Sequence, residues 1–167
     1  PMLLGGKGAP ALEALLAPLG FSMGIAADRV GVASAIKMCR SVMIKGLESL
    51  LVESLTSARA YGVEDRVVAS LHETFPELDW EKVASYMVSR TALHGKRRAE
   101  EMREVAVTVR EAGLDPWMAS ATAERQDWMA ASKEPAHLAQ VAKDANWREY
   151  ADRLLAAVAA RRTSAVD

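Results

Sequence analysis

Two patterns of apolar positions divide the chain near residue 30. In residues 1–30, a short apolar run from Pro1 to Leu4 ends in two glycines, which is typical of the end of a buried strand. Apolar residues at helical spacing follow over residues 10–19, and residues 21–26 fit a second short strand. Such a strand–helix–strand unit is too small to bury its own apolar faces. We therefore expect residues 1–30 to be the C-terminal remnant of a larger α/β domain.

Helical spacing dominates residues 31–167, and the fold class that it predicts is mainly α. Residues 32–61 carry apolar side chains on nearly all faces, which predicts a long, buried central helix that ends at Gly62. Further helices are expected over residues 64–75, after an N-cap at Asp79, and through the charged segment from Leu93 to Ala112. Another is expected after an Asp115 cap followed by Pro116, with a break at Glu134-Pro135, and a last one over residues 145–160. We therefore expect one helical bundle around the central helix.

Composition and charge narrow the classes of function. Alanine accounts for 31 of the 167 residues, and it favours helices over strands. The formal net charge is −1, so the chain lacks a bulk positive field and no nucleic-acid partner is expected. The single cysteine, Cys39, excludes an intrachain disulfide and a cysteine-rich zinc site, and no metal site is predicted. Because we find neither a membrane-spanning apolar run nor a signal peptide, we expect no membrane association and a cytoplasmic location.

The main candidate for chemistry is the pair Lys37 and Ser41 in the first turns of the central helix. Residues four apart share a helix face, so their side chains are expected to lie side by side. A lysine in an apolar, buried helix is unfavourable unless it is paired or functional, and desolvation would favour its use in acid–base chemistry. In the alternative interpretation the Lys37 ammonium reaches solvent, and Arg40 and Lys45 are further exposed positions.

Two separate segments carry a resemblance to a known family. The segment from Gly31 to Ser41 resembles the glycine-rich entry to the long central helix of the β-hydroxyacid dehydrogenase superfamily, which includes 3-hydroxyisobutyrate and 6-phosphogluconate dehydrogenases. In this resemblance Gly31 matches the first glycine and Lys37 the catalytic lysine. The segment from Thr91 to Glu104 is similar to the helical C-terminal domain of a 6-phosphogluconate-dehydrogenase-like subgroup.

The resemblance implies a domain organisation and a fold. Residues 1–30 would be the C-terminal remnant of a dinucleotide-binding Rossmann domain, and residues 31–167 a helical domain for substrate binding and dimerisation. The fold implied for the second domain is a helical bundle like the C-terminal domain of 6-phosphogluconate dehydrogenase, arranged around a long central helix.

The chain departs from the family pattern at three positions. Ser41 stands where the family has an asparagine, so its side chain has a shorter reach toward a substrate. Ala33 replaces the second glycine of the pattern. Ile44 lies seven residues after Lys37, where the decarboxylating sugar-acid enzymes have a glutamate. Oxidative decarboxylation of 6-phosphogluconate is therefore not expected of this chain.

Further substrate contacts follow from the resemblance and from a polar cluster. The resemblance places Gly31 and Ser34 near the substrate together with Ser41. The residues His94, Arg97, Arg98 and Glu101 form the densest polar cluster of the chain, and an arginine fork there would suit a substrate carboxylate or a cofactor phosphate. In the alternative interpretation this cluster is a solvated helix face on which the glutamates pair with the basic residues.

Taken with the resemblance, these features predict the C-terminal part of an NAD(P)-dependent oxidoreductase. The enzyme would transfer a hydride between a nicotinamide and a hydroxy acid or related carbonyl compound, with Lys37 exchanging the hydroxyl proton. NAD or NADP would be bound mainly upstream of residue 1, so the chain alone should be inactive. The apolar central helix and the four tryptophans predict a homodimer. The alternative is a non-enzymatic helical module for oligomerisation, in which Lys37 is structural.

Overall fold

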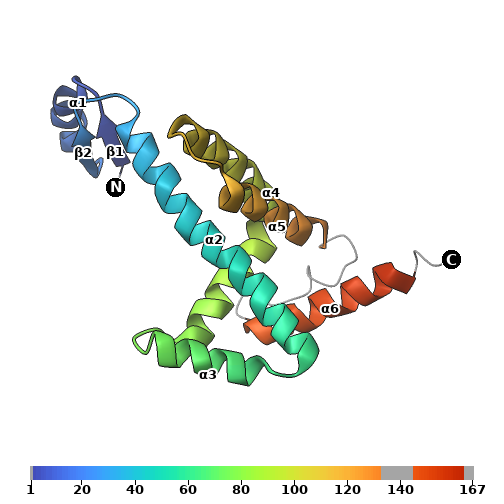
Figure 1. The fold of residues 1–167 in the computed structure, drawn as a ribbon. Coiled ribbons are helices and arrows are strands. Elements are labelled where there is room, and N and C mark those ends of the chain that lie inside the picture. The colour runs from blue at the N-terminus through green and yellow to red at the C-terminus, as the bar shows by residue number, and fades with distance from the viewer. Residues whose placement is uncertain (1, 133–144, 164–167) are drawn as a thin grey trace.

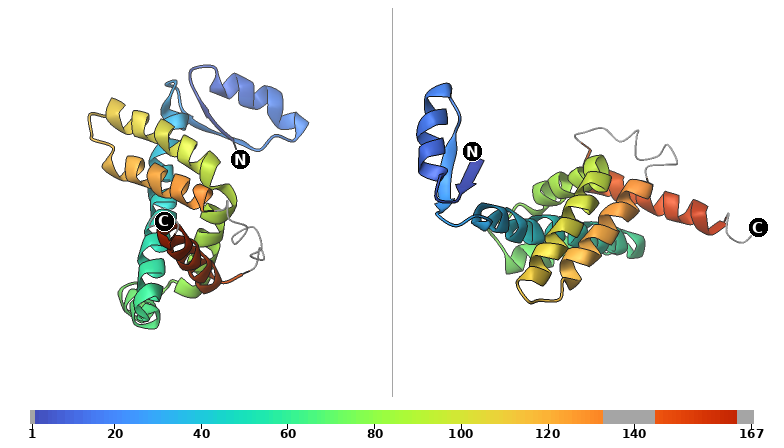
Figure 2. Two further views of the ribbon diagram at one scale, coloured as in Figure 1. Left: turned by 90° about the vertical axis from the view of Figure 1, so that its right-hand side faces the viewer. Right: turned by 90° about the horizontal axis from the view of Figure 1, so that it is seen from above.

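The N-terminal residues form a small parallel βαβ unit in the computed structural model, which describes residues 2–132 and 145–163. Strand β1 (Met2–Gly5) is followed by helix α1 (Ala9–Leu16), a 3₁₀ turn η1 (Ala17–Leu19) and strand β2 (Met23–Ala27). The two strands pair in parallel. Figures 1 and 2 show this unit at the N-terminal end of helix α2, away from the other helices. The predicted strand–helix–strand arrangement is confirmed.

Helix α2 (Val32–Tyr61) is the long central helix that the apolar pattern predicts. It begins after Gly31 and ends before Gly62, and both glycines have left-handed backbone angles, with φ of 92° and 66°. A residue with a Cβ atom is strained in this conformation, which explains why glycine stands at both ends of the helix. The helix connects the βαβ unit to the rest of the fold (Figure 1).

Four more helices complete the described chain. They are α3 (Glu64–Thr74), α4 (Trp80–Glu111), α5 (Trp117–Ala131) and α6 (Trp147–Thr163). The Asp79 side chain accepts a hydrogen bond from the Lys82 backbone N–H, as expected of an N-cap. The expected cap at Asp115 is wrong, because Pro116 has a ψ of 47° and is itself the residue before the helix. The break expected at Glu134-Pro135 lies outside the described residues.

Two clusters of buried side chains hold the helices together. The larger one joins α2 to α4 and α6, with Val52 and Leu55 packed among Val88, Tyr150 and Leu154. The smaller one joins the second half of α4 to α5. Gly95 of α4 permits the close approach of these two helices, because a Cβ atom there would lie 2.7 Å from the Gln126 carbonyl oxygen. In the described residues all strands lie before residue 30, which confirms the mainly-α fold.

The expectation that the central helix is buried on nearly all faces is wrong for this chain. Met43 is 73% exposed and Leu50 is 55% exposed, although both lie in the middle of α2. Helices α4, α5 and α6 pack against α2, but they leave one side of it uncovered. An apolar pattern shows that a face can be buried, but it does not show that the same chain supplies the cover.

The four tryptophans also differ from one another in burial. Trp80 and Trp147 are buried in the core, whereas Trp117 at the start of α5 is 76% exposed. Trp128 is partly buried beside the larger core cluster, with the Arg125 guanidinium over its ring. Among the described residues, no helix is both long enough and apolar enough to cross a membrane.

Candidate active site

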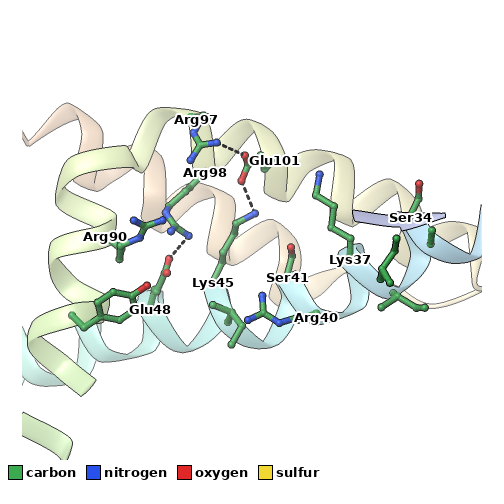
Figure 3. Close-up of a pocket in the computed structure, with 15 residues that line it drawn as sticks. Ser34, Lys37, Arg40, Ser41, Lys45, Glu48, Arg90, Arg97, Arg98 and Glu101 are labelled. Atoms are coloured by element: carbon green, nitrogen blue, oxygen red, sulfur yellow. Dashed lines mark hydrogen bonds and ion pairs between the residues drawn. The ribbon is translucent and has the colours of Figure 1, made fainter. Parts of the chain in front are cut away.

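A polar cleft of about 630 Å³ lies between α2 and α4, within the volume range of small-molecule sites. Most of its walls come from these two helices, and Leu3 of β1 closes one end. Figure 3 shows its polar side chains, which include Ser34, Lys37, Arg40, Ser41, Lys45 and Glu48 from α2 and Arg90, Arg97, Arg98 and Glu101 from α4. The cleft therefore combines residues from two segments that lie about fifty positions apart in the sequence.

Lys37 and Ser41 lie on the same wall of this cleft, one helical turn apart. Lys37 is exposed, and Figure 3 shows its side chain directed from α2 toward α4. Ser41 is buried at the base of the same wall. The expectation of a buried Lys37 is wrong, because α2 begins beyond the part of the bundle that covers it. The arrangement nevertheless brings an amine and a hydroxyl group to a surface that a small molecule can reach.

Lys45 lies two turns after Lys37 on the same helix face, and it pairs with Glu101 across the cleft. The Lys45 Nζ atom lies 2.6 Å from a Glu101 carboxylate oxygen, and the Arg97 guanidinium lies 3.1 Å from the other oxygen. Burial raises the pKa of Glu101, but the hydrogen bond from Lys45 and the charges of Lys45 and Arg97 outweigh it, so the pKa is lowered overall. Glu101 is thus held as a carboxylate between two cations.

A buried polar network lies at the end of the cleft away from Lys37. Arg98 donates a hydrogen bond of 2.9 Å to Glu48, and the Gln126 amide of α5 donates one of 3.3 Å to the same oxygen. Burial raises the pKa of Glu48, and the neighbouring Arg98 and Gln126 only partly oppose this effect. Both charged side chains are buried and have lost their hydration. Each therefore depends on its partner to stabilise its charge.

The structure separates the predicted site residues into two groups. Ser34, Lys37, Ser41, Arg97 and Arg98 line the cleft together. Gly31 instead lies at the N-terminus of α2 and lines a separate hollow with Cys39. His94 lines another hollow with Gly95 and Lys96 of α4, and Arg97 lines both this hollow and the cleft. The roles assigned to all of these residues remain predictions.

Different residues in the charged segment of α4 fit different interpretations of that segment. Arg97 is exposed and pairs with Glu101 four residues on, as expected of a solvated helix face. Arg98 is buried and pairs with Glu48 of α2, which no pattern within α4 predicts. One helix therefore presents adjacent arginines to different surroundings.

Sequence reasoning missed Lys45, Glu48 and Arg90 as residues of the cleft. A signal for the first two was present, because Lys37, Ser41, Lys45 and Glu48 follow one another at spacings of four, four and three. This spacing places all four on one face of a helix, and it indicates a polar stripe rather than isolated exposed positions. No comparable signal marks Arg90, since its place in the cleft depends on how α4 packs against α2.

The chain is similar to one described protein family and to two solved structures. Residues 58–129 match a family described as a domain of unknown function (DUF1932). A crystal structure of a conserved hypothetical protein from Sinorhizobium meliloti 1021 is 38% identical, with a TM-score of 0.85, over 93% of this chain and 51% of that protein. The conserved protein MTH1747, of unknown function, is described as structurally similar to 3-hydroxyacid dehydrogenases. It is 31% identical, with a TM-score of 0.67, over 77% of this chain and 49% of that one.

The resemblance to the β-hydroxyacid dehydrogenase superfamily is confirmed. An uncharacterized 28.5 kDa protein from the 7S RNA 5′ region of Methanothermus fervidus is also 31% identical over 124 residues, which are 72% of this chain and 47% of that protein. The chain thus spans about half the length of the proteins that it matches. The match to the Sinorhizobium meliloti structure covers 93% of this chain, so the two proteins share most of this mainly-α fold.

Proposed function

We propose that the chain is the C-terminal, substrate-binding portion of an NAD(P)-dependent oxidoreductase that transfers a hydride between a nicotinamide and a hydroxy acid. The observation that carries the proposal is the position of Lys37 and Ser41 on one wall of a cationic cleft. The similarity to a protein described as resembling 3-hydroxyacid dehydrogenases supports this reaction class. A cytoplasmic location is part of the proposal and rests on the single, exposed Cys39.

Lys37 has the position and chemistry of a general acid–base group in this proposal. In oxidation its neutral amine accepts the proton of the substrate hydroxyl, and in reduction its ammonium returns a proton to the carbonyl oxygen. Ser41 donates a hydrogen bond to the same substrate oxygen or to a carboxylate beside it. The cationic lining attracts the acid group, which holds the substrate in the cleft between α2 and α4.

The βαβ unit fits a cofactor-binding domain, because its apolar side chains lack cover within the described chain. Leu3 and Ile25 on the strands are nearly half exposed, and Leu15 on α1 is 69% exposed. A two-stranded parallel sheet is stable only as part of a larger sheet with covered faces. We therefore propose that residues 1–30 belong to a dinucleotide-binding domain and residues 31–167 to the substrate domain.

The same unit adjoins the candidate site. Leu3 lines the cleft beside Ala33 and Ser34, at the end nearest Lys37. When bound, NAD or NADP would supply or accept the hydride at this end. Residues of this chain would hold and orient the substrate, with Ser34 and Leu3 forming part of the cleft wall.

A homodimer is the proposed assembly. The uncovered side of α2 exposes Met43 and Leu50, and the start of α5 exposes Trp117 and Met118. Monomeric proteins seldom leave so many large apolar side chains in contact with water along one helix and its neighbours. A second copy of the chain would provide the missing cover.

The test of the proposed activity uses the complete protein, in which we propose that a dinucleotide-binding domain extends upstream of residue 1. A panel of 2- and 3-hydroxy acids is assayed with NAD and with NADP, by the absorbance of the reduced nicotinamide. We expect turnover of at least one member and a loss of kcat of roughly 10²–10⁴-fold in Lys37→Ala. Lys96→Ala, which removes an exposed lysine of α4 that does not line this cleft, should leave the rate unchanged. Equal rates in wild type and Lys37→Ala would exclude the assigned role.

A further inference from the structure

The lining of the cleft carries far more positive charge than the chain as a whole. Six of its side chains are cationic and two are carboxylates, a net formal charge of +4 in a chain whose net charge is −1. One carboxylate group on a hydroxy acid would balance only part of this charge. An excess of fixed cations in a concave site favours a ligand with more than one negative charge.

Three of the six cations already have a carboxylate partner. Lys45 and Arg97 share Glu101, and Arg98 is held by Glu48. Lys37, Arg40 and Arg90 line the same cleft, and in the described part of the chain no carboxylate forms an ion pair with any of them. Lys37 is assigned to the reacting hydroxyl group in the proposed function, so Arg40 and Arg90 are the cations available for acid groups.

Arg90 is the more constrained of these two arginines. Its guanidinium lies 5.9 Å from the centre of the Tyr86 ring, and its Nε atom is buried without a hydrogen-bond partner. Glu48 does not satisfy it, because that carboxylate receives its hydrogen bonds from Arg98 and Gln126. A planar guanidinium that lines the cleft and forms no ion pair within the described residues is suited to bidentate binding of a carboxylate or a phosphate.

The length of the cleft separates Arg90 from the reacting end. Figure 3 shows Arg90 beside Arg98 and Glu48, at the end opposite Lys37. Lys37 and Glu48 are eleven residues apart on α2, which corresponds to about 16 Å along a helix. The long side chains of Lys37 and Arg90 can shorten the span between their charged groups, and a ligand that contacts both needs a second acid group beyond its hydroxyl carbon.

We propose that the substrate carries a second anionic group, a carboxylate or a phosphate, and that Arg90 binds this group at the end of the cleft away from Lys37. This inference rests on the proposed function, because it takes Lys37 as the residue at the hydroxyl group. Arg90 is then a specificity-determining residue, which separates dianionic substrates from simple hydroxy acids of the same reaction class.

The test compares ligands that differ in one acid group. Binding of glycerate, 3-phosphoglycerate and malate to the complete protein is measured by isothermal titration calorimetry, without added cofactor and without turnover. We expect 3-phosphoglycerate, malate or both to bind about tenfold or more tightly than glycerate, as one charge-assisted contact to a guanidinium predicts. A preference for only one of the two identifies the second group as a phosphate or a carboxylate. Equal binding of all three ligands, or binding of none, would overturn the proposal.

Variants assign the preference to Arg90. Arg90→Gln should reduce the preference for the dianion to within about twofold, whereas Arg90→Lys should retain part of it because the charge remains. Arg66→Gln, which removes an exposed arginine from α3 away from the cleft, should change nothing. A preference that persists in Arg90→Gln, with the fold verified by circular dichroism, would contradict the assignment.

Two further results separate this inference from its alternatives. If 2′-phosphoadenosine competes with 3-phosphoglycerate and its own binding is lost in Arg90→Gln, Arg90 serves a cofactor and the proposal fails. If the dianion preference is found while Lys37→Ala leaves turnover of the complete protein unchanged, the proposed function fails and the anion site remains.

Discussion

Arg98 of α4 and Glu48 of α2 form an ion pair of 2.9 Å although they are fifty residues apart and their side chains are only 7% and 1% exposed. The pair fixes the two walls of the cleft relative to each other. Gln126 of α5 contacts the same carboxylate, so three helices meet at one buried negative charge.

Arg98→Met should therefore be strongly destabilising. It removes one partner of a buried pair and leaves the Glu48 charge uncompensated, which typically reduces the free energy of unfolding by about 3–5 kcal/mol. Arg98→Met/Glu48→Met should recover much of the loss, because apolar side chains replace both charges. Urea denaturation of the three proteins at neutral pH measures the effect. Additive losses in the double variant would show that the two residues are not coupled.

The loss in Arg98→Met should also depend on pH. Because burial already raises the pKa of Glu48 above its ordinary value of 4.5, the folded state binds this proton more tightly than the unfolded state. The contribution of Glu48 protonation to the stability of the folded state is therefore fully present below pH 4.5, and it is lost as the pH rises through the folded pKa. The difference in the free energy of unfolding between Arg98→Met and wild type should shrink as the pH falls from 7 toward 5. The reason is that Arg98, which opposes protonation of Glu48, is missing in the variant, so Glu48 becomes neutral there at a higher pH. A difference that is constant over this range would contradict the assignment to Glu48.

Lys37→Arg should not restore the activity that Lys37→Ala loses. A guanidinium keeps the positive charge but does not release its proton near neutral pH, so it cannot act as the base. Steady-state kinetics of the complete protein should show kcat reduced to about the level of Lys37→Ala, while KM changes less because the charge remains. An active Lys37→Arg enzyme would mean that position 37 needs only a cation.

Gly95→Ala and Gly46→Ala should have opposite effects, although both glycines are buried in helices. A Cβ atom at position 95 would lie 2.7 Å from one backbone atom of α5 and 3.2 Å from another, so the helices must separate. Overpacking of this kind costs about 1–3 kcal/mol. At position 46 the nearest atom is the Thr122 hydroxyl at 3.8 Å, so alanine fits and its helix propensity adds up to about 1 kcal/mol. Thermal denaturation of the two variants provides the comparison.

The proposed homodimer should depend on the uncovered side of α2. Light scattering should give a dimer mass for the chain at micromolar concentration. Met43→Asp/Leu50→Asp should shift the mass to that of a monomer, because it places two charges in the expected interface. Leu15→Asp changes a residue of similar exposure on α1 and should leave the mass unaltered. A monomer of wild-type protein would exclude this assembly.

The sequence predicts features that depend on local interactions, such as helix ends, but it does not predict contacts between distant helices. Gly62 and Asp79 mark helix ends through the backbone conformation and hydrogen bonds of their own turns, so the sequence locates both ends. The partner of Arg98 is determined by the crossing of α2 and α4, and no spacing within either helix encodes it. The exposure of Lys37 agrees with the alternative interpretation of the sequence, in which its ammonium reaches solvent. The exposure of Met43 was beyond prediction, because periodicity identifies an apolar face but does not specify which surface covers it.

The cationic side chains of the cleft all project from two long helices, α2 and α4, and none of them stands on a loop. The backbone around a bound anion is therefore ordered before the ligand arrives. Binding would immobilise a few side chains, at about 0.5–1.5 kcal/mol each, without the larger entropic penalty of folding a segment around the ligand. Discrimination between anions would then depend on the fixed distance between the charged groups of the protein. The site would select ligands by the distance between their own acid groups.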